Sequence, residues 1–244
     1  MSEPHYTSYL ALDRILGAQA PRSRPEHHDE LLFIVVHQAS ELWFKVILHE
    51  LDALIASLRG NDLPGALLVI RRINGLVAIV TSQLSALDTL PPQRFAEFRG
   101  FLGASSGSQS EQFRAIEVLS GLRDPAFLTM IGADAAASPL VQRALARPTL
   151  ESLFEDLLTT HGVTLEQVYT DRSRTSLLLL AEALLDYEQG FARWRFLHVQ
   201  LVERIIGPDT GGTGGSLGAR DLRQTVGNRF FPKLWAVRAR FYEG

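Results

Sequence analysis

Three long stretches of the chain repeat their apolar residues at helical spacing, and this pattern constrains the fold more than any other feature of the sequence. They span residues 29–59, 62–90 and 173–206. In the first stretch, residues 31–36 are all apolar and together cover nearly every side of the helix, which is typical of a buried central helix. Asp29 stands at its expected N-cap. Almost no segment alternates with a period of two, so the sequence predicts an all-α fold packed as a helical bundle.

The chain divides into an arm and one domain. Within residues 1–25, Tyr6, Tyr9 and Leu10 precede a break rich in proline and arginine. We predict an arm that covers the domain surface or reaches a neighbouring subunit. Residues 26–244 are expected to form a single helical domain. Shorter helices are predicted at 95–99, at 124–132, 139–146, 149–160, 222–225 and 232–241. A further helix is predicted to follow the loop 100–107 and to end at Glu117.

The composition excludes several classes of function. A net charge of −3 gives no electrostatic basis for binding nucleic acid or an anionic membrane. The absence of cysteine excludes disulfides, thiolate metal sites and thiol nucleophiles. The sequence shows no basic-then-apolar leader, and no apolar run is read as long enough to cross a membrane. We therefore expect a cytoplasmic protein.

Two histidines lie on apolar helix faces. His198 falls in a stripe with Phe191, Trp194 and Leu201, where an imidazole can serve a buried metal or haem iron. The alternative is a core histidine bonded to a backbone carbonyl. His37 lies on the same face as Phe33 and needs a partner if buried. A zinc site is disfavoured because no His-Glu-x-x-His pattern occurs, and His27-His28-Asp29 fits a helix start better than a metal site.

An arginine and a glycine-rich loop are candidates for holding a ligand. Arg99, between Phe98 and Gly100, has the planar fork that pairs with a substrate carboxylate, or it forms a surface ion pair. The loop 211–218 lacks the Gly-Lys-Ser/Thr of a phosphate loop and has Leu217 where a dinucleotide fingerprint needs glycine. It favours a loop that closes over a ligand, with Thr213 as a polar contact; a flexible linker is the alternative. The sequence has no Gly-x-Ser-x-Gly elbow, and no carboxylate pair stands out for glycoside chemistry.

Taken together, these segments resemble the tryptophan 2,3-dioxygenase family, haem enzymes that oxidise the indole ring with O2. The motifs occur in the family's order from Tyr6 to near the C-terminus. They are His28 to Lys45, Phe98-Arg99-Gly100, Ser105 to Gln109, Phe191 to His198, and Gly212 to Ser216.

The resemblance implies an all-helical haem domain of the tryptophan/indoleamine dioxygenase type, with haem b, assembled as a homotetramer. It makes His198 the iron ligand, His37 the distal catalytic residue facing the indole N–H, and Arg99 the clamp for the substrate carboxylate. The resemblance assigns the remaining positions to the same pocket. Phe33, Phe95 and Thr213 would bind substrate, Trp194, Ser106 and Gly107 would contact haem, and Tyr6, Tyr9 and Leu10 would enter the neighbouring subunit's pocket.

The sequence departs from the family pattern at three places. Phe95 replaces a tyrosine found in some members, Leu84 replaces an expected aromatic residue, and the segment between Thr160 and Tyr187 is abbreviated. The favoured function is 2,3-dioxygenation of L-tryptophan to N-formylkynurenine. The alternatives are mono-oxygenation of tryptophan or a methylated tryptophan to a 2-oxindole, a haem or ligand sensor without turnover, and a helical protein without cofactor.

Overall fold

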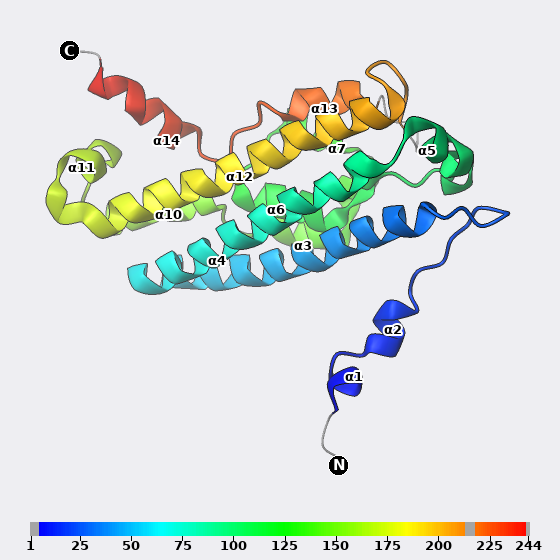
Figure 1. Cartoon of the computed structure of the whole chain (residues 1–244). Helices are drawn as coiled ribbons and strands as arrows, with labels where there is room; N and C mark the ends of the chain where they lie inside the picture. The colour runs from blue at the N-terminus through cyan, green and yellow to red at the C-terminus, as the bar shows by residue number, and fades with distance from the viewer. Residues whose placement is uncertain (1–4, 213–217, 243–244) are drawn as a thin grey trace.

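The computed structural model describes residues 5–212 and 218–242, and within these ranges the regular elements are helical (Figure 1). The predicted all-α fold is confirmed. The α-helices are α1 (Tyr6–Tyr9), α2 (Leu12–Leu16), α3 (Glu30–Arg59), α4 (Leu63–Ser82), α5 (Pro92–Arg99), α6 (Glu111–Ser120), α7 (Pro125–Ile131), α8 (Ala133–Ala137), α9 (Pro139–Leu145), α10 (Leu150–Thr160), α11 (Leu165–Thr170), α12 (Thr175–Ile206), α13 (Ala219–Thr225) and α14 (Pro232–Ala236). Short 3-10 helices are η1 (Gln83–Thr89), η2 (Gly100–Leu102), η3 (Gly107–Gln109), η4 (Arg172–Arg174) and η6 (Val237–Phe241).

The three long helices α3, α4 and α12 pack side by side and form the frame of the molecule (Figure 1). Fully buried side chains such as Ile47, Ile70 and Leu184 fill the space between them. Gly190 lets α12 approach α4 closely, because a Cβ at this position would lie 2.8 Å from Cγ1 of Val77. Burial of these apolar faces supplies most of the stabilisation that the helices need.

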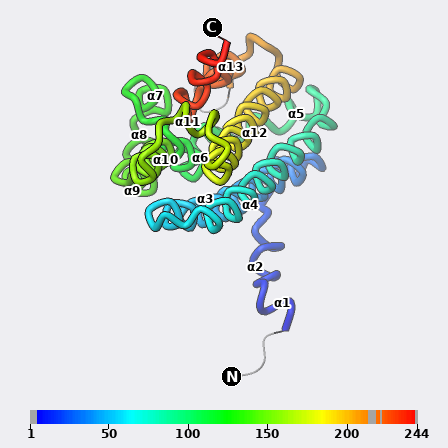
Figure 2. The backbone as a smooth tube through the Cα atoms, turned by 90° about the vertical axis from the view of Figure 1, so that its left-hand side faces the viewer, coloured from blue at the N-terminus to red at the C-terminus, as the bar shows by residue number. Residues whose placement is uncertain are grey.

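Helices α6 to α11 form a second group beside α3 and α12 (Figure 2). Helix α6 is its centre, since every residue from Phe113 to Ser120 is buried. This run includes two charged residues, Arg114 and Glu117, so the second group carries a polar network inside the core.

The stretch 62–90 is not one continuous α-helix. Helix α4 ends at Ser82, and residues 83–89 form the 3-10 helix η1. The hydroxyl groups of Ser82, Ser85 and Thr89 each donate to the carbonyl three residues earlier, and such local bonds compete with the α-helical pattern. The apolar residues of this stretch keep their helical spacing across Ser82, so the sequence pattern does not show where the α-helix gives way to a 3-10 helix.

The arm formed by α1 and α2 extends away from the helical body (Figures 1 and 2). Tyr6 and Tyr9 are 74% and 77% exposed. Gln19 and Gln38 join the base of the arm to α3, where Nε2 of Gln19 donates to Oε1 of Gln38 at 2.7 Å. The described arm therefore meets its own body only near its root.

The start of α3 differs from the prediction, because Asp29 makes no side-chain cap bond. Its carboxylate pairs instead with Arg94, 3.3 Å away. The adjacent Glu30 is buried and accepts bonds from the backbone amides of Arg22 and Ser23 and from the Ser23 hydroxyl. Burial raises the pKa of Glu30, but these bonds outweigh it and keep the pKa below its ordinary value of 4.5.

Glu30→Ala should lower the free energy of unfolding by about 1–3 kcal/mol, since it leaves the buried amide and hydroxyl of Ser23 without their partner. Because the folded pKa lies below the unfolded one, the wild-type contribution is complete above about pH 4.5 and is lost as the pH falls. Urea unfolding between pH 7 and pH 4 measures both effects. Glu97→Ala, at an exposed ion pair with His27, is the matched control and should change stability by less than about 1 kcal/mol. Equal effects of the two variants would contradict the role of Glu30.

Two helical stretches, Glu30–Arg59 and Leu63–Thr89, are long and apolar enough to cross a membrane by length and composition. This corrects the sequence-based view that no apolar run reaches that length. Both helices contribute to the main apolar core, where Leu51 and Leu54 of α3 and Ile73 of α4 are fully buried. A core helix passes the same test, so these two stretches are weak grounds for a membrane location.

Candidate functional site

His198 lies on the C-terminal half of α12, with the indole ring of Trp194 one turn before it. The two ring centres are 4.9 Å apart. Trp194 in turn packs on Phe113 of α6, with ring centres 4.7 Å apart. The imidazole therefore packs on the Trp194 ring, which Phe113 of α6 supports in turn.

His37 lies on α3 and its protonation pattern follows from one contact. Nδ1 of His37 is 2.7 Å from the carbonyl oxygen of Phe33. A carbonyl can only accept, so Nδ1 carries the proton and the neutral ring keeps a lone pair on Nε2. Desolvation by the surrounding protein lowers the pKa of His37. The Phe33 carbonyl and the charge of Glu41 raise it, but by less. His37 as a residue is exposed, so it presents a neutral acceptor at an accessible surface.

The two histidines each pack on an aromatic side chain at the edge of one apolar cluster, His37 on Phe33 and His198 on Trp194. Burial is the main cause that lowers the pKa of His198 to about 4, and His37 and Arg114 contribute to the same shift. A histidine with this pKa is neutral at physiological pH, and a neutral nitrogen is what iron requires.

An apolar cluster lines the same region. It joins α3, η1, α5 and the end of α12, and Phe33 and Trp194 pack at its edge. Phe33 contacts Phe95 and Phe98, with ring centres 5.6 and 5.8 Å apart. The buried members are Val36, Leu84, Leu87, Leu90, Phe95, Phe98, Leu201 and Ile205. These walls suit a flat, apolar ligand.

Arg99, at the end of α5, reaches the glycine-rich segment. Its Nη2 donates to the carbonyl oxygen of Gly211. The structure thus brings Arg99 to the residues that immediately precede Thr213, as the ligand-closing hypothesis requires. Thr213 itself lies outside the described residues.

Other predicted site residues are not joined to the histidines by any described contact. Ser106 caps η3, where its hydroxyl oxygen lies 2.9 Å from the Ser108 hydroxyl, and Gly107 begins that helix in an exposed loop. Tyr6, Tyr9 and Leu10 lie in the projecting arm. Phe95 and Phe33, by contrast, belong to the apolar cluster beside His37. Their roles as ligand contacts remain predictions.

The described residues contain no group of three His, Asp or Glu side chains able to hold a metal ion. Nε2 of His27 pairs with Glu97 at 2.8 Å, and its Nδ1 accepts from the Asp29 amide. His27 therefore acts at the start of α3, as expected. Iron held by one protein ligand, as in haem proteins, needs no such group.

Sequence reasoning did not single out Arg114, which the structure places beside the site. Arg114 is buried on α6, and its Nε has no hydrogen-bond partner in the described structure. The indole Nε1 of Trp194 is also buried without a partner. Two unpaired buried donors near His198 call for an acceptor, and the carboxylates of a haem would satisfy both. The only sequence signal was the pair of charged residues, Arg114 and Glu117, inside a helical run that is otherwise mostly apolar.

A cavity beside the apolar cluster shares the buried residues Leu84 and Leu201 with it. It has a volume of about 860 Å³ and runs between α4, η1 and α12, with lining residues that include Asn74, Thr81, Asp186, Arg193 and Arg204. At about 100° per residue, Arg193 and Arg204 point well away from His198 around α12. This groove contains none of the predicted site residues.

Comparison with known proteins identifies the family to which the chain belongs. The family model described as tryptophan 2,3-dioxygenase matches residues 1–129 and 151–241. Residues 130–150 lie outside the match. The match is continuous across the segment between Thr160 and Tyr187.

Three curated relatives, each called tryptophan 2,3-dioxygenase, align over nearly the whole chain. The protein of Rhodococcus jostii is 41% identical over 96% of this chain and 90% of its own length. That of Herpetosiphon aurantiacus is 42% identical over 96% and 97%, and that of Serratia proteamaculans is 38% identical over 96% and 91%. The chain therefore belongs to the tryptophan 2,3-dioxygenase family.

Proposed function

We propose that this protein is a haem-dependent dioxygenase that converts L-tryptophan and O2 to N-formylkynurenine. The observation that carries the proposal is the pair of histidines, His37 on α3 and His198 on α12, each packed on an aromatic side chain at the edge of one apolar cluster. The names of the relatives support the choice of tryptophan as substrate. They give no support to mono-oxygenation, to a sensor without turnover or to a protein without cofactor.

His198 is the residue that would hold haem b, through a neutral imidazole nitrogen. When bound, the haem supplies the iron that binds and activates O2. The unpaired donors Nε of Arg114 and Nε1 of Trp194 would bind its carboxylates. Ser106 and Gly107 are proposed to lie near its distal side, as the family resemblance implies.

The protein's own contribution is to bind, orient and shield the substrate. Nε2 of His37 would accept the indole N–H, while Nδ1 keeps its proton on the Phe33 carbonyl. Phe33 and Phe95 would contact the ring and exclude water. Arg99 would exchange the Gly211 carbonyl for the substrate carboxylate, with Thr213 as a further contact. Such positioning can lower the barrier by several kcal/mol.

The arm is proposed to complete the pocket of a neighbouring subunit in a homotetramer. Tyr6 and Tyr9 are among the more exposed large side chains, and they lie on an arm that extends from the body. Leu10 follows them on the same arm. A cytoplasmic location remains a prediction.

The function is tested by expressing the protein with ample haem, reducing the iron, and adding L-tryptophan in air-saturated buffer. We expect a Soret band and tryptophan-dependent O2 consumption. A Soret band without O2 consumption would favour the sensor alternative, and protein that stays colourless with ample haem would contradict the proposal as a whole.

His37→Ala should reduce the preference for L-tryptophan over 1-methyl-L-tryptophan. In the wild type, methylation removes the N–H that Nε2 of His37 accepts, which is worth about fivefold to tenfold in kcat/KM. The variant has no such bond to lose, so the two substrates should react at similar rates. An unchanged preference would remove His37 from contact with the indole nitrogen.

A further inference from the structure

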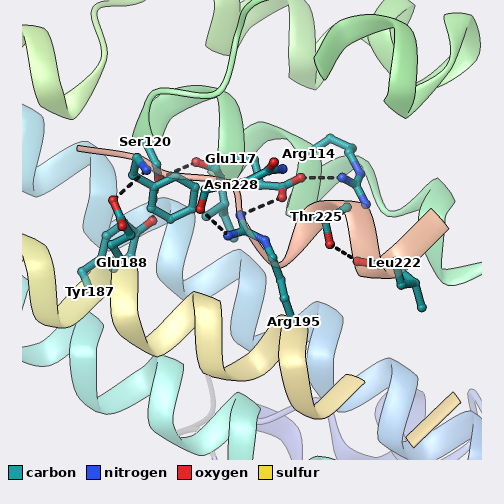
Figure 3. Close-up of polar contacts among 11 residues, drawn as sticks. Arg114, Glu117, Ser120, Tyr187, Glu188, Arg195, Leu222, Thr225 and Asn228 are labelled. Atoms are coloured by element: carbon teal, nitrogen blue, oxygen red, sulfur yellow. Dashed lines mark hydrogen bonds and ion pairs between the residues drawn. The ribbon is translucent and has the colours of Figure 1, made fainter. Parts of the chain in front are cut away.

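Glu117 lies at the centre of a buried ion network behind the site. Its two carboxylate oxygens accept from Nη1 of Arg114 at 2.5 Å and from Nη2 of Arg195 at 2.9 Å (Figure 3). Glu117 is fully buried, and the two arginines are 8% and 2% exposed. The network therefore connects α6 with α12 at Arg195, which precedes His198 by three residues.

The network carries more positive than negative charge. One carboxylate faces two guanidinium groups, and the neighbouring carboxylate of Glu188 is engaged by Arg229, Trp235 and the amides of Phe230 and Phe231. An unbalanced buried cation is unfavourable unless an anion approaches it. Arg114 is the member near the histidine, since its guanidinium carbon lies 5.1 Å from the ring centre of Phe113, which packs on Trp194 beside His198.

Arg195 is itself held from behind. Its Nη1 lies 3.5 Å from the carbonyl oxygen of Asn228, and its guanidinium carbon lies 5.0 Å from the ring centre of Phe230. The 228–231 segment crosses the end of α6 at Gly121, where a Cβ would lie 2.6 Å from the carbonyl oxygen of Phe230. This close packing leaves Arg195 little freedom, so it can hold Glu117 in place.

We propose that Glu117 is a positioning residue: fixed by Arg195, it holds the guanidinium of Arg114 at the edge of the pocket, ready to bind a carboxylate of the haem. This inference rests on the proposed haem-binding function. Without Glu117, Arg114 would lose its charged partner and the order of its side chain, and the cofactor would lose a preorganised contact.

The test is the rate at which the ferric holoprotein transfers haem to an excess of haem-free myoglobin. Glu117→Gln should speed release about tenfold, the effect of one charge-assisted bond. Ser120→Ala is the matched control on the same helix. It removes the 2.7 Å hydrogen bond to Tyr187 without touching Arg114, so it should leave the release rate within about twofold of the wild type even where it lowers stability.

A double-mutant cycle separates positioning from general loosening. If Glu117 acts through Arg114, Glu117→Gln should have no further effect on haem release in an Arg114→Met background. Additive effects, or equal release from the Glu117→Gln and Ser120→Ala variants, would overturn the inference. Should Glu117→Gln fail to fold, Glu117→Asp keeps the charge but shortens the reach, and it should also release haem faster than Ser120→Ala. A wild type without haem would refute the proposed function instead.

Discussion

Replacing His198 with alanine should leave a folded protein that no longer retains haem. The imidazole is the iron ligand in the proposed site, and loss of even a supporting partner of a metal ligand weakens binding 10–100-fold, so loss of the ligand should weaken it by at least about 100-fold. The methyl group that remains cannot coordinate iron. The measurement is haem content per protein after expression with ample haem, read from the Soret band.

The control is His161→Ala, because His161 directly follows α10, and the α10–α11 end of the molecule lies opposite to the C-terminal end of α12 (Figure 1). Its Nε2 is 2.7 Å from Oδ1 of Asn61. This variant should retain full haem content. Added imidazole should restore part of the Soret band in the His198 variant, since it can fill the space that the side chain leaves. Normal haem content in His198→Ala would show that another group holds the iron.

Arg99→Ala should weaken L-tryptophan binding by about 2–5 kcal/mol, the usual effect of removing one member of a desolvated charge pair. Tryptamine, which lacks the carboxylate, should bind the variant and the wild type about equally. The quantity to measure is the dissociation constant of each ligand for the holoprotein, by spectral titration.

Arg94→Ala is the control on the same helix, where Arg94 pairs with Asp29 at an exposed site. It should leave both dissociation constants within about twofold, as expected of a surface ion pair. If Arg99→Ala binds tryptophan as the wild type does, Arg99 is not the carboxylate clamp.

The long helices could be predicted because their apolar periodicity records burial directly. The stretches 29–59 and 173–206 correspond to α3 and α12 within two residues. The change to a 3-10 helix after Ser82 could not be predicted, because it depends on hydroxyl bonds to the backbone that leave the apolar pattern intact. Helix α11, between two short loops, also gave no strong signal.

Some residues around the candidate site could likewise be singled out from the sequence, and others could not. His37 and His198 were singled out because each lies on an apolar helix face, and in the structure each packs on an aromatic side chain at the edge of one apolar cluster. The roles of these histidines and of Arg99 at the site remain predictions. Glu30 and Glu117 were missed because a glutamate in a helix is usually solvated, and only three-dimensional packing shows the buried donors around them.

The central claim is that both atoms of O2 enter the indole ring of L-tryptophan at a haem held by His198. The most direct measurement is the product mass after one turnover of the ferrous holoprotein with L-tryptophan and isotopically labelled O2. The account predicts N-formylkynurenine carrying two labelled oxygen atoms. An oxindole carrying a single labelled oxygen, or unchanged tryptophan in fully haem-loaded protein, would contradict it.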